Sequence, residues 1–388
     1  MKVYLVGGAV RDELLDLPVL DRDWVVVGAT TNEMLAAGYT QVGKDFPVFL
    51  HPQTKEEYAL ARTERKSGQG YTGFSVQASP EVTLEEDLLR RDLTINAMAK
   101  SDAGEIIDPF NGQDDLAQGL LRHVSPAFSE DPVRILRIAR FAARFAQSGF
   151  KVAHGTNALM RTMVANGEID YLVPERVWSE WCKALETGTP EKFFQVLRGC
   201  QALKILFPEV NSAYTKEGAS HTNDDLPTPL SSLKQVALQT SDTKIRFSAL
   251  MFALFEQHDQ HEATSKLNTL CKRLKVPKHY AQLAQKVIGN KTHICSQNAD
   301  ELLQVFLSTR AFKQTESWQG LLDTYLSLEH ITPTTAEQLE KLRITVAGVS
   351  AQQFNQENLT GPELGAAIKN QQRLLIRENL SKGNINSH

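Results

Sequence analysis

The chain has 388 residues, of which 41% are hydrophobic, and its formal net charge at pH 7 is −4. This length and composition predict a soluble globular protein of roughly two to four domains. The weakly acidic balance excludes a protein that coats nucleic acid through bulk positive charge. Because no apolar run is long enough to act as a signal peptide or to span a bilayer, we expect a cytoplasmic protein without membrane contacts.

The first third of the chain alternates strand-like and helix-like segments. Strands are predicted over 3–6, 23–27, 46–51 and 57–61, and helices over 9–17 and 31–37. Such alternation is typical of a small α/β domain. The segment 62–74 carries three glycines and a cluster of basic residues, which predicts a flexible loop.

Beyond Pro126 the hydrophobic period becomes helical and stays helical. A polar stretch over 211–232 is interpreted as a linker between two helical parts. We therefore expect an α+β protein with a small N-terminal α/β head over 1–122. A helical neck follows over 123–210, and an all-helical body and tail fill 233–388.

The four cysteines are scattered along the chain and include no C-x-x-C pair: Cys182, Cys200, Cys271 and Cys295. This spacing predicts neither a zinc site nor a disulfide framework. We expect all four to be reduced and mostly buried.

Two adjacent glycines, Gly7 and Gly8, separate the first strand from the first helix. Glycines at a helix start let an anionic ligand approach the main chain, where unpaired N–H groups and the helix dipole favour negative charge. Arg11, one turn into that helix, adds a positive charge. Such a turn alone is more often structural than functional.

Asp21 and Asp23 lie one residue apart at the start of the second strand. In an extended strand they project on one face, where two carboxylates repel unless a cation lies between them. They therefore predict a divalent metal site of the kind that serves phosphoryl chemistry. The alternative is a solvated turn after Pro18.

An anion site next to a dication site favours a nucleotidyltransferase. In such an enzyme two Mg²⁺ ions about 3.5–4 Å apart activate an attacking hydroxyl and stabilise the leaving pyrophosphate. Asp12 is close in sequence to this pair, but we expect it to form a local ion pair with an arginine. The sequence assigns no third metal-binding carboxylate.

The stretch EEDLLRRDLTINAMA places Arg90 and Arg91 after an acidic turn. We expect Arg91 to hold a phosphate, with Asp92 and Asn96 orienting its guanidinium. The alternative is an ordinary helix whose acidic residues lie at its start and whose basic residues lie at its end.

In the stretch EDPVRILRIARF, Pro132 suits the first position of a helix, and Asp131 then suits its N-cap. Asp131 and Arg134 are three residues apart and can also project side by side. A carboxylate only accepts hydrogen bonds and a guanidinium only donates them. The pair therefore matches cytosine and adenine, which present an amino donor beside a ring-nitrogen acceptor, and mismatches uracil and guanine.

Three further arginines continue a basic stripe along the same helix: Arg137, Arg140 and Arg144. The segment 121–210 carries 12 Lys and Arg residues against 9 Asp and Glu. A local patch of this kind suits a triphosphate or an RNA backbone. The alternative is a salt-bridged helix face.

Five motifs together resemble the bacterial class II tRNA nucleotidyltransferases, the CCA-adding enzymes: GGAVRD at 7–12, DRDW at 21–24, RRDLTINA at 90–97, EDPVRILRIARF at 130–141 and PERVWSE at 174–180. The resemblance runs over roughly the first 210 residues. It implies a polymerase-beta-like nucleotidyltransferase head over 1–122. Enzymes of this family add C, C and A to the 3′ end of tRNA without a nucleic-acid template.

The resemblance also implies roles for individual residues and partners. Asp21 and Asp23 are expected to be catalytic and to bind Mg²⁺. The nucleotide is expected to be held by Gly8, Arg11 and Arg91 and selected by Asp131, Arg134, Arg137 and Arg140. ATP, CTP and tRNA are the implied partners, and the region 233–388 is expected to bind tRNA.

Glu175, Arg176 and Glu180 match a further motif of the family, and we expect them to brace the neck helices. The alternative is an ordinary surface pair between Arg176 and Glu180, which contributes little to stability.

Beyond about residue 210 the resemblance weakens. Some relatives carry an HD-type phosphohydrolase domain there, which needs a His-Asp pair on a metal. Phe252 and Ala253 stand where that pair would align, while His258 and Asp259 lie in a polar, loop-like stretch. We expect no phosphohydrolase activity.

Two other functions remain open on the sequence alone. Bacterial poly(A) polymerases are similar in the catalytic portion, and an RNA-binding protein could retain the fold without catalysis. We expect a monomer, with a weak homodimer as the alternative. The segment 62–74 is expected to help the switch from adding C to adding A.

Overall fold

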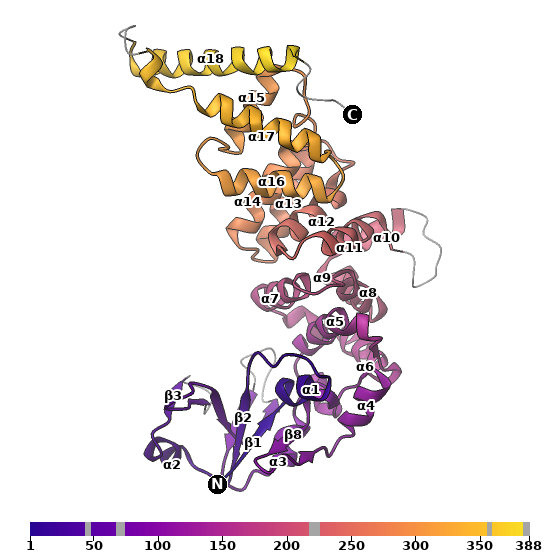
Figure 1. Cartoon of the computed structure of the whole chain (residues 1–388). Coiled ribbons are helices and arrows are strands. Elements are labelled where there is room, and N and C mark those ends of the chain that lie inside the picture. Colours follow the sequence, from indigo (N-terminus) through magenta and orange to yellow (C-terminus); the bar gives the residue numbers. More distant parts are fainter. Residues whose placement is uncertain (43–47, 67–73, 217–225, 355–358, 383–388) are drawn as a thin grey trace. The chain divides into compact units, whose positions relative to one another are not determined.

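The structure, a computed structural model, describes residues 1–42, 48–66, 74–216, 226–354 and 359–382 (Figure 1). The chain forms two compact units. Unit 1 comprises Met1–Ala184 and Lys192–Pro208, and unit 2 comprises Leu185–Glu191 and Glu209–His388. None of the helices in the described ranges is long and apolar enough to cross a membrane.

Unit 1 contains a seven-stranded mixed sheet with the strand order β3-β4-β5-β2-β1-β8-β9. Its strands are β1 (Lys2–Val6), β2 (Asp23–Val27), β3 (Thr40–Val42), β4 (Val48–Leu50), β5 (Glu57–Leu60), β8 (Ala99–Ser101) and β9 (Ile106–Ile107). The β2–β5 pair is parallel and the other pairs are antiparallel. The predicted α/β head is thus confirmed.

Both faces of the central strand β2 are covered. Val25 packs in a buried cluster with Leu88, and the next residue, Val26, packs in a second cluster with Met34. Because successive side chains of a strand point to opposite faces, these two clusters lie on the two sides of the sheet. This explains why the strand reads as a continuous apolar run rather than as an alternating pattern.

The remainder of unit 1 is mainly helical. Its helices are α1 (Gly8–Leu14), α2 (Thr31–Ala36), α3 (Leu84–Leu89), α4 (Gly112–Gln118), α5 (Val133–Phe145), α6 (His154–Ala165), α7 (Pro174–Leu185), α8 (Glu191–Gly199) and α9 (Leu203–Leu206). Short strands β10 (Leu120–Leu121) and β11 (Lys151–Val152) pair in parallel. In α5, Ile135, Leu136, Ile138 and Ala139 are fully buried, so this arginine-bearing helix is fixed in the core of the unit.

The described part of unit 2 is helical. After α10 (Pro208–Lys216), its helices are α11 (Thr228–Gln239), α12 (Thr243–Phe255), α13 (Gln260–Arg273), α14 (Lys278–Gly289), α15 (Ala299–Ser308), α16 (Thr315–Ser327), α17 (Pro333–Ala347) and α18 (Gly361–Ser381). A large buried cluster, which includes Trp318 and Tyr325, forms the core of these helices. The predicted helical body is confirmed.

Two predicted loops contain regular structure. The expected linker over 211–232 was wrong at both ends, since α10 continues to Lys216 and α11 begins at Thr228. Val210 and Tyr214 are buried and hold α10 in place. The expected loop over 62–74 begins with strand β6 (Arg62–Lys66), which pairs with β7 (Phe74–Ala78). Residues 67–73, in the middle of that prediction, lie outside the described residues.

The positions considered for a phosphohydrolase have structural roles. Phe252 is 4% exposed and packs edge-on against the rings of Tyr325 and His330. Asp259 is the N-cap of α13 and accepts a hydrogen bond from the Glu262 N–H at 2.9 Å. His258 Nδ1 lies 3.0 Å from the Glu262 carboxylate. The four cysteines form no disulfide bonds with one another, as expected.

Candidate active site

The strand pairing brings the predicted metal and anion sites together. Asp23 lies opposite Val6 in the antiparallel register of β1 and β2. Val6 is followed directly by Gly7 and then by α1, so the acidic start of one strand adjoins the glycine turn at the end of its neighbour (Figure 1). The juxtaposition follows from the antiparallel pairing, which sets the two strand ends side by side.

The carboxylates of Asp21 and Asp23 are open to solvent. No described side chain forms an ion pair or a hydrogen bond with either of them. Nearby protein withdraws part of the water around Asp23 and raises its pKa; Arg91 opposes this rise and Asp21 adds to it. The two carboxylates are therefore close enough for the charge of one to affect the other. A cation shared by both would require this closeness.

A third carboxylate lies near the pair by register. Glu57 on β5 is the partner of Asp23 in the parallel β2–β5 pair. The described residues nevertheless contain no group of three or more His, Cys, Asp or Glu side chains close enough to hold a metal ion. The fit to a divalent cation therefore rests on two unpaired carboxylates, which is a common set for Mg²⁺ when substrate phosphates complete its shell.

The glycine turn is packed against two guanidinium groups. Gly7 has φ +72°, a conformation that side-chain-bearing residues rarely adopt, and a Cβ there would lie 2.7 Å from Arg91 Nη1. A Cβ on Gly8 would lie 3.4 Å from Arg11 Nη2. The glycines thus allow two positive charges to approach the main chain at the start of α1.

Arg91 is held by Asp87 and by the main chain. Its Nη2 donates to Asp87 Oδ2 at 3.2 Å, and its Nη1 donates to the Asn96 carbonyl at 3.4 Å. The expectation that Asp92 orients Arg91 was wrong, because Asp92 pairs elsewhere and Asp87 forms the ion pair. Burial lowers the pKa of Arg91, and Asp87 opposes the shift. Its Nε is buried with no hydrogen-bond partner in the described structure.

Arg11 is 2% exposed and is engaged within the protein. Its Nε and Nη2 donate to Asp12 Oδ1 at 2.9 and 2.8 Å, and its Nη1 donates to Asn96 Oδ1 at 2.5 Å. The guanidinium also lies 5.2 Å from the ring centre of Phe141 and 5.1 Å from that of Phe145, which is cation–π distance. These contacts tie α1 to α5.

Asp12 forms the local ion pair that the sequence predicted, and it has a second partner. Besides Arg11, it accepts a hydrogen bond from Arg144 Nη2 at 2.9 Å. Arg144 is the last arginine of the basic stripe on α5. The predicted stripe is therefore compensated at this end by an acid from α1.

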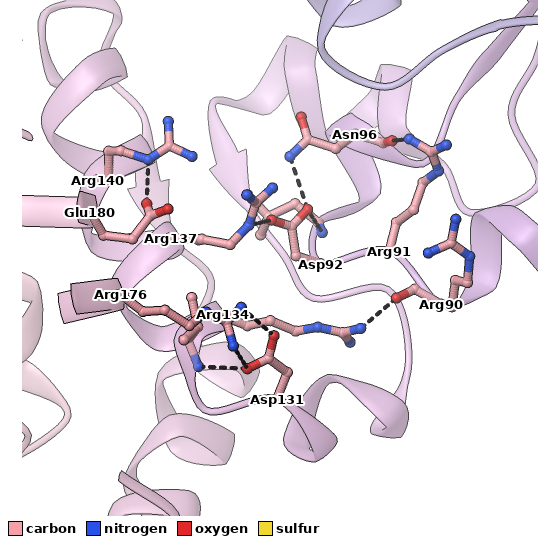
Figure 2. A network of polar contacts seen from close by, with 12 residues as sticks. Arg90, Arg91, Asp92, Asn96, Asp131, Arg134, Arg137, Arg140, Arg176 and Glu180 are labelled. Atoms are coloured by element: carbon pink, nitrogen blue, oxygen red, sulfur yellow. Dashed lines mark hydrogen bonds and ion pairs between the residues drawn. The ribbon is translucent and has the colours of Figure 1, made fainter. Parts of the chain in front are cut away.

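Arg137 extends from α5 to Asp92 (Figure 2). Its Nε donates to Asp92 Oδ2 at 2.6 Å, and Asn96 Nδ2 donates to Asp92 Oδ1 at 3.0 Å. Burial alone would raise the pKa of Asp92, but the charge of Arg137 and these hydrogen bonds outweigh burial and lower it. Asp92 therefore stays ionised and holds Arg137 in place.

Asp131 and Arg134 lie together at the start of α5 but are held by different partners (Figure 2). Asp131 Oδ1 accepts from the Val133 N–H at 3.0 Å, as an N-cap does, and Asp131 Oδ2 accepts from Arg176 Nη2 at 3.1 Å. Arg134 is 9% exposed. Its Nη1 donates to the Ala127 carbonyl at 3.0 Å and its Nη2 to the Arg90 carbonyl at 2.6 Å.

Arg140 and Arg176 link α5 to α7. Arg140 Nε donates to Glu180 Oε2 at 2.5 Å, and Arg176 on α7 pairs with Asp131. Glu180 is buried. The alternative of a surface pair between Arg176 and Glu180 was therefore wrong, because each residue has a separate partner on or next to α5.

The structure thus groups the predicted residues into two sets within unit 1. The first set lies where β1 ends and β2 begins, and it comprises Asp21, Asp23 and Gly8, with Arg91 packed against Gly7. Asp131, Arg134, Arg137 and Arg140 lie along the first part of α5. Arg11, Asn96 and Asp92 form a continuous hydrogen-bonded connection between the two sets.

Several members of this network were not identified from the sequence. Asp87 is the acid that holds Arg91, and the rings of Phe141 and Phe145 flank Arg11. Arg176 was expected to brace the neck helices, but its pairing with Asp131 was not predicted. A signal for the rings was available, because Phe141 and Phe145 are four residues apart and therefore share one helix face. The long-range ion pairs leave no comparable periodic signal.

Two family models match the chain. The Poly A polymerase head domain matches residues 3–122. The family described as the probable RNA and SrmB-binding site of polymerase A matches residues 149–214.

Similar proteins are found over nearly the whole chain. A multifunctional CCA protein of Thioalkalivibrio sulfidiphilus (strain HL-EbGR7) is 50% identical over 392 residues, which cover 95% of this chain and 96% of that protein. The structure also resembles the Thermotoga maritima CCA-adding enzyme complexed with tRNA, with a TM-score of 0.63 and 20% identity over 98% of this chain and 91% of that one. The Bacillus stearothermophilus CCA-adding enzyme in complex with CTP gives a TM-score of 0.64 and 21% identity, over 97% of this chain and 89% of that one.

Proposed function

The chain belongs to the family of CCA-adding enzymes, which are tRNA nucleotidyltransferases, and we propose that it adds C, C and A to the 3′ end of tRNA from CTP and ATP, with release of pyrophosphate. The observation that carries this proposal is the register of β1 and β2. It sets the unpaired carboxylate at the start of β2 beside the glycine turn and its arginines.

Asp21 and Asp23 are the residues proposed to hold Mg²⁺ and to support catalysis. When bound, the metal would activate the attacking 3′-hydroxyl and stabilise charge on the phosphates. The fit is supported by two exposed acidic residues whose charges interact and which form no ion pair with a described side chain.

The triphosphate is proposed to bind at the start of α1. Gly8 leaves the main chain accessible, and the N-cap Gly7 makes no side-chain capping hydrogen bond, so the first N–H groups of the helix can donate to phosphate oxygens. Arg91 supplies positive charge beside them. Arg11 adds to the positive potential, and because its nitrogens already donate to Asp12 and Asn96, its main role is to position the turn against α5.

Base selection is proposed for Asp131 and Arg134. An ionised carboxylate can accept about four hydrogen bonds and a guanidinium can donate five. Asp131 accepts from the Val133 N–H and Arg176, which leaves acceptor capacity for the amino group of C or A. Arg134 carries five N–H donors. Besides its bonds to the Ala127 and Arg90 carbonyls, it would donate a hydrogen bond to the ring nitrogen.

Arg137 and Arg140 are proposed to complete the nucleotide site. Each is anchored through Nε to an acid, Asp92 and Glu180 respectively. Nη groups of both guanidinium groups carry N–H donors that these Nε contacts do not use. Anchoring reduces the conformational entropy that the side chains would lose on binding the nucleotide.

We propose that tRNA is the acceptor of the nucleotides. We also propose that the protein is located in the cytoplasm and acts as a monomer. The match over 149–214 to a probable RNA-binding family supports an RNA contact in this helical region. An additional tRNA contact is proposed for the helices of 233–388. We further propose that the segment 62–74 helps the enzyme to change from adding C to adding A.

The proposal is tested by supplying tRNA that lacks its 3′ end with one nucleoside triphosphate at a time. CTP alone is expected to add two residues, and ATP is expected to add one residue only after both C residues are in place. Long A tails on RNA of arbitrary sequence would indicate a poly(A) polymerase instead. Absence of any incorporation would indicate an RNA-binding protein without catalysis.

A further inference from the structure

A polar hollow lies in unit 2 between α13, α14 and α15. Its volume is about 670 Å³, within the range of about 300–1,000 Å³ that is common for small-molecule sites. Its wall includes Lys286, Asn290, His293, Glu301, Ser308 and Arg310. Because charged and amide groups line it, the hollow suits a polar ligand that forms several hydrogen bonds.

The hydrogen bonds of the wall divide the hollow into two ends. At one end Lys286 Nζ donates to the Thr309 carbonyl at 3.2 Å and to Ser317 Oγ at 2.6 Å. At the other end His293 Nδ1 lies 3.1 Å from Glu301 Oε2. Residues 301–308 are one helical segment of α15, so the two ends are about 10 Å apart.

The first end is cationic. Neither Lys286 nor Arg310 forms an ion pair with a carboxylate in the described part of the chain. Partial burial lowers the pKa of Lys286, and the charge of Arg310 lowers it further. Two positive charges therefore share one end of the hollow without a counter-ion, and a phosphate placed between them would accept hydrogen bonds from both.

The second end is acidic. Glu301 Oε2 accepts from Ser296 Oγ at 2.6 Å, and the hydrogen bonds from Ser296 and His293 lower the pKa of Glu301. The group is therefore ionised at neutral pH and can only accept hydrogen bonds. No described group donates to its Oε1, so this end suits an amino or hydroxyl group of a ligand.

We propose that this hollow binds a nucleotide, with the phosphate between Lys286 and Arg310 and an amino or hydroxyl group at Glu301. A free nucleoside monophosphate and a nucleotide of an RNA strand share this chemistry. The proposed site lies wholly in unit 2 and uses none of the residues assigned to nucleotide addition. Its failure would therefore leave the proposed addition of C, C and A unaffected, and only the RNA form of the site rests on the tRNA contact proposed for 233–388.

Equilibrium dialysis of the full chain with labelled AMP tests the site. We expect wild type to bind a second equivalent beyond that of the site in unit 1. The double variant Lys286→Gln/Arg310→Gln should bind this second equivalent about tenfold more weakly or worse, which is the scale of one lost charged hydrogen bond. Lys278→Gln, an exposed change on α14 that does not line the hollow, should retain it.

A second variant separates the two ends. Glu301→Gln should weaken AMP binding at this site while leaving competition by inorganic phosphate unchanged, whereas Arg310→Gln should weaken both. Arg310 is exposed, so its single variant remains informative if the double variant does not fold.

The source of the nucleotide is distinguished by a second assay, the affinity for tRNA. If wild type binds a second equivalent of AMP and the double variant does not, the ligand of the hollow is a free nucleotide. If AMP shows no second equivalent, a tenfold weaker tRNA affinity in the double variant but not in Lys278→Gln identifies an RNA nucleotide. Unchanged AMP stoichiometry together with unchanged tRNA affinity in a folded double variant overturns the proposal.

Discussion

Arg137 on α5 donates to the carboxylate of Asp92 at 2.6 Å, and Asp92 accepts from the side chain of Asn96 at 3.0 Å. Asn96 in turn accepts from Arg11 at 2.5 Å. These bonds connect the arginines proposed to select the base with the turn proposed to hold the triphosphate. A change in one of these side chains is therefore expected to alter both parts of the site.

Asp92→Asn removes the charge that anchors Arg137. We expect a loss of about 1–3 kcal/mol in the free energy of unfolding at pH 7, because a charged hydrogen bond is broken while Arg137 keeps partial access to water. Urea unfolding followed by tryptophan fluorescence measures this loss. Asp102→Asn, an exposed change in a turn, should leave the unfolding midpoint within error.

The same pair has a defined pH dependence. The pKa of Asp92 is lower in the folded chain than its unfolded value of about 3.9. Its ionisation therefore stabilises the fold fully above that value, and this contribution is lost as the pH falls through the folded pKa. The stability difference between wild type and Asp92→Asn should be constant from about pH 6 to 8 and should shrink below about pH 4. A difference that grows in acid contradicts the assignment.

Gly7→Ala tests the contact between the glycine turn and Arg91. Gly28 has the same φ of +72°, but a Cβ there would meet only the N-terminal nitrogen, at 4.0 Å. Both substitutions should cost about 1–3 kcal/mol of stability from backbone strain, because φ is positive at both positions. Only Gly7→Ala should also displace Arg91 and lower kcat/KM for CTP, by about tenfold or more. Equal kinetic effects of the two changes would show that Arg91 has no such role.

Asp23→Asn tests the proposed metal site. The variant should keep the fold and lose at least about a thousandfold in nucleotide incorporation, equivalent to roughly 4 kcal/mol of transition-state stabilisation. Asp16→Asn is the matched control, because Asp16 is an exposed acid in the same connection between β1 and β2 and Asn tolerates its positive φ. Wild-type incorporation by Asp23→Asn would remove this carboxylate from the mechanism.

We predict that the chain has no phosphohydrolase activity, because Phe252, where the His-Asp pair of HD-type relatives would align, is buried among aromatic rings of unit 2. Its ring packs against Tyr325 and His330, where an apolar side chain cannot serve as a metal ligand. The purified chain with Mn²⁺ or Ni²⁺ should release no phosphate from a model phosphodiester. Metal-dependent release that survives further purification would show that other residues form such a site.

The fold was largely predictable from the sequence where hydrophobic periodicity is strong. The strand at 23–27 has the predicted bounds, and the mainly helical character beyond Pro126 is confirmed. The expectation that this part is wholly helical was wrong, because the short strand β11 (Lys151–Val152) pairs with β10. Strand β6 was missed because Arg62–Lys66 is almost wholly polar, so it lacks the apolar alternation on which strand prediction depends. The prediction ended the helical region at residue 210, before the end of α10 at Lys216, because the last turn of this helix is polar.

The candidate site was predicted as a set of residues, but its internal pairing was not. Short-range pairs such as Arg11 with Asp12 follow from neighbouring positions. The partners of Asp131 and Arg140 lie 45 and 40 residues away on α7, and only the packing of α5 against α7 brings them together. A single sequence shows which charges are present, whereas the tertiary fold decides which of them neutralise one another.

The central claim is that the protein itself reads the hydrogen-bonding edge of the incoming base. The most direct test is the ratio of kcat/KM for CTP to that for UTP, measured for wild type and Arg134→Ala on tRNA that lacks its 3′ end. This ratio is independent of the fraction of enzyme that is folded. We predict that it falls by about tenfold to a hundredfold, the scale of one or two lost hydrogen bonds to a base. An unchanged ratio, with or without a loss of overall activity, would contradict base selection by Arg134.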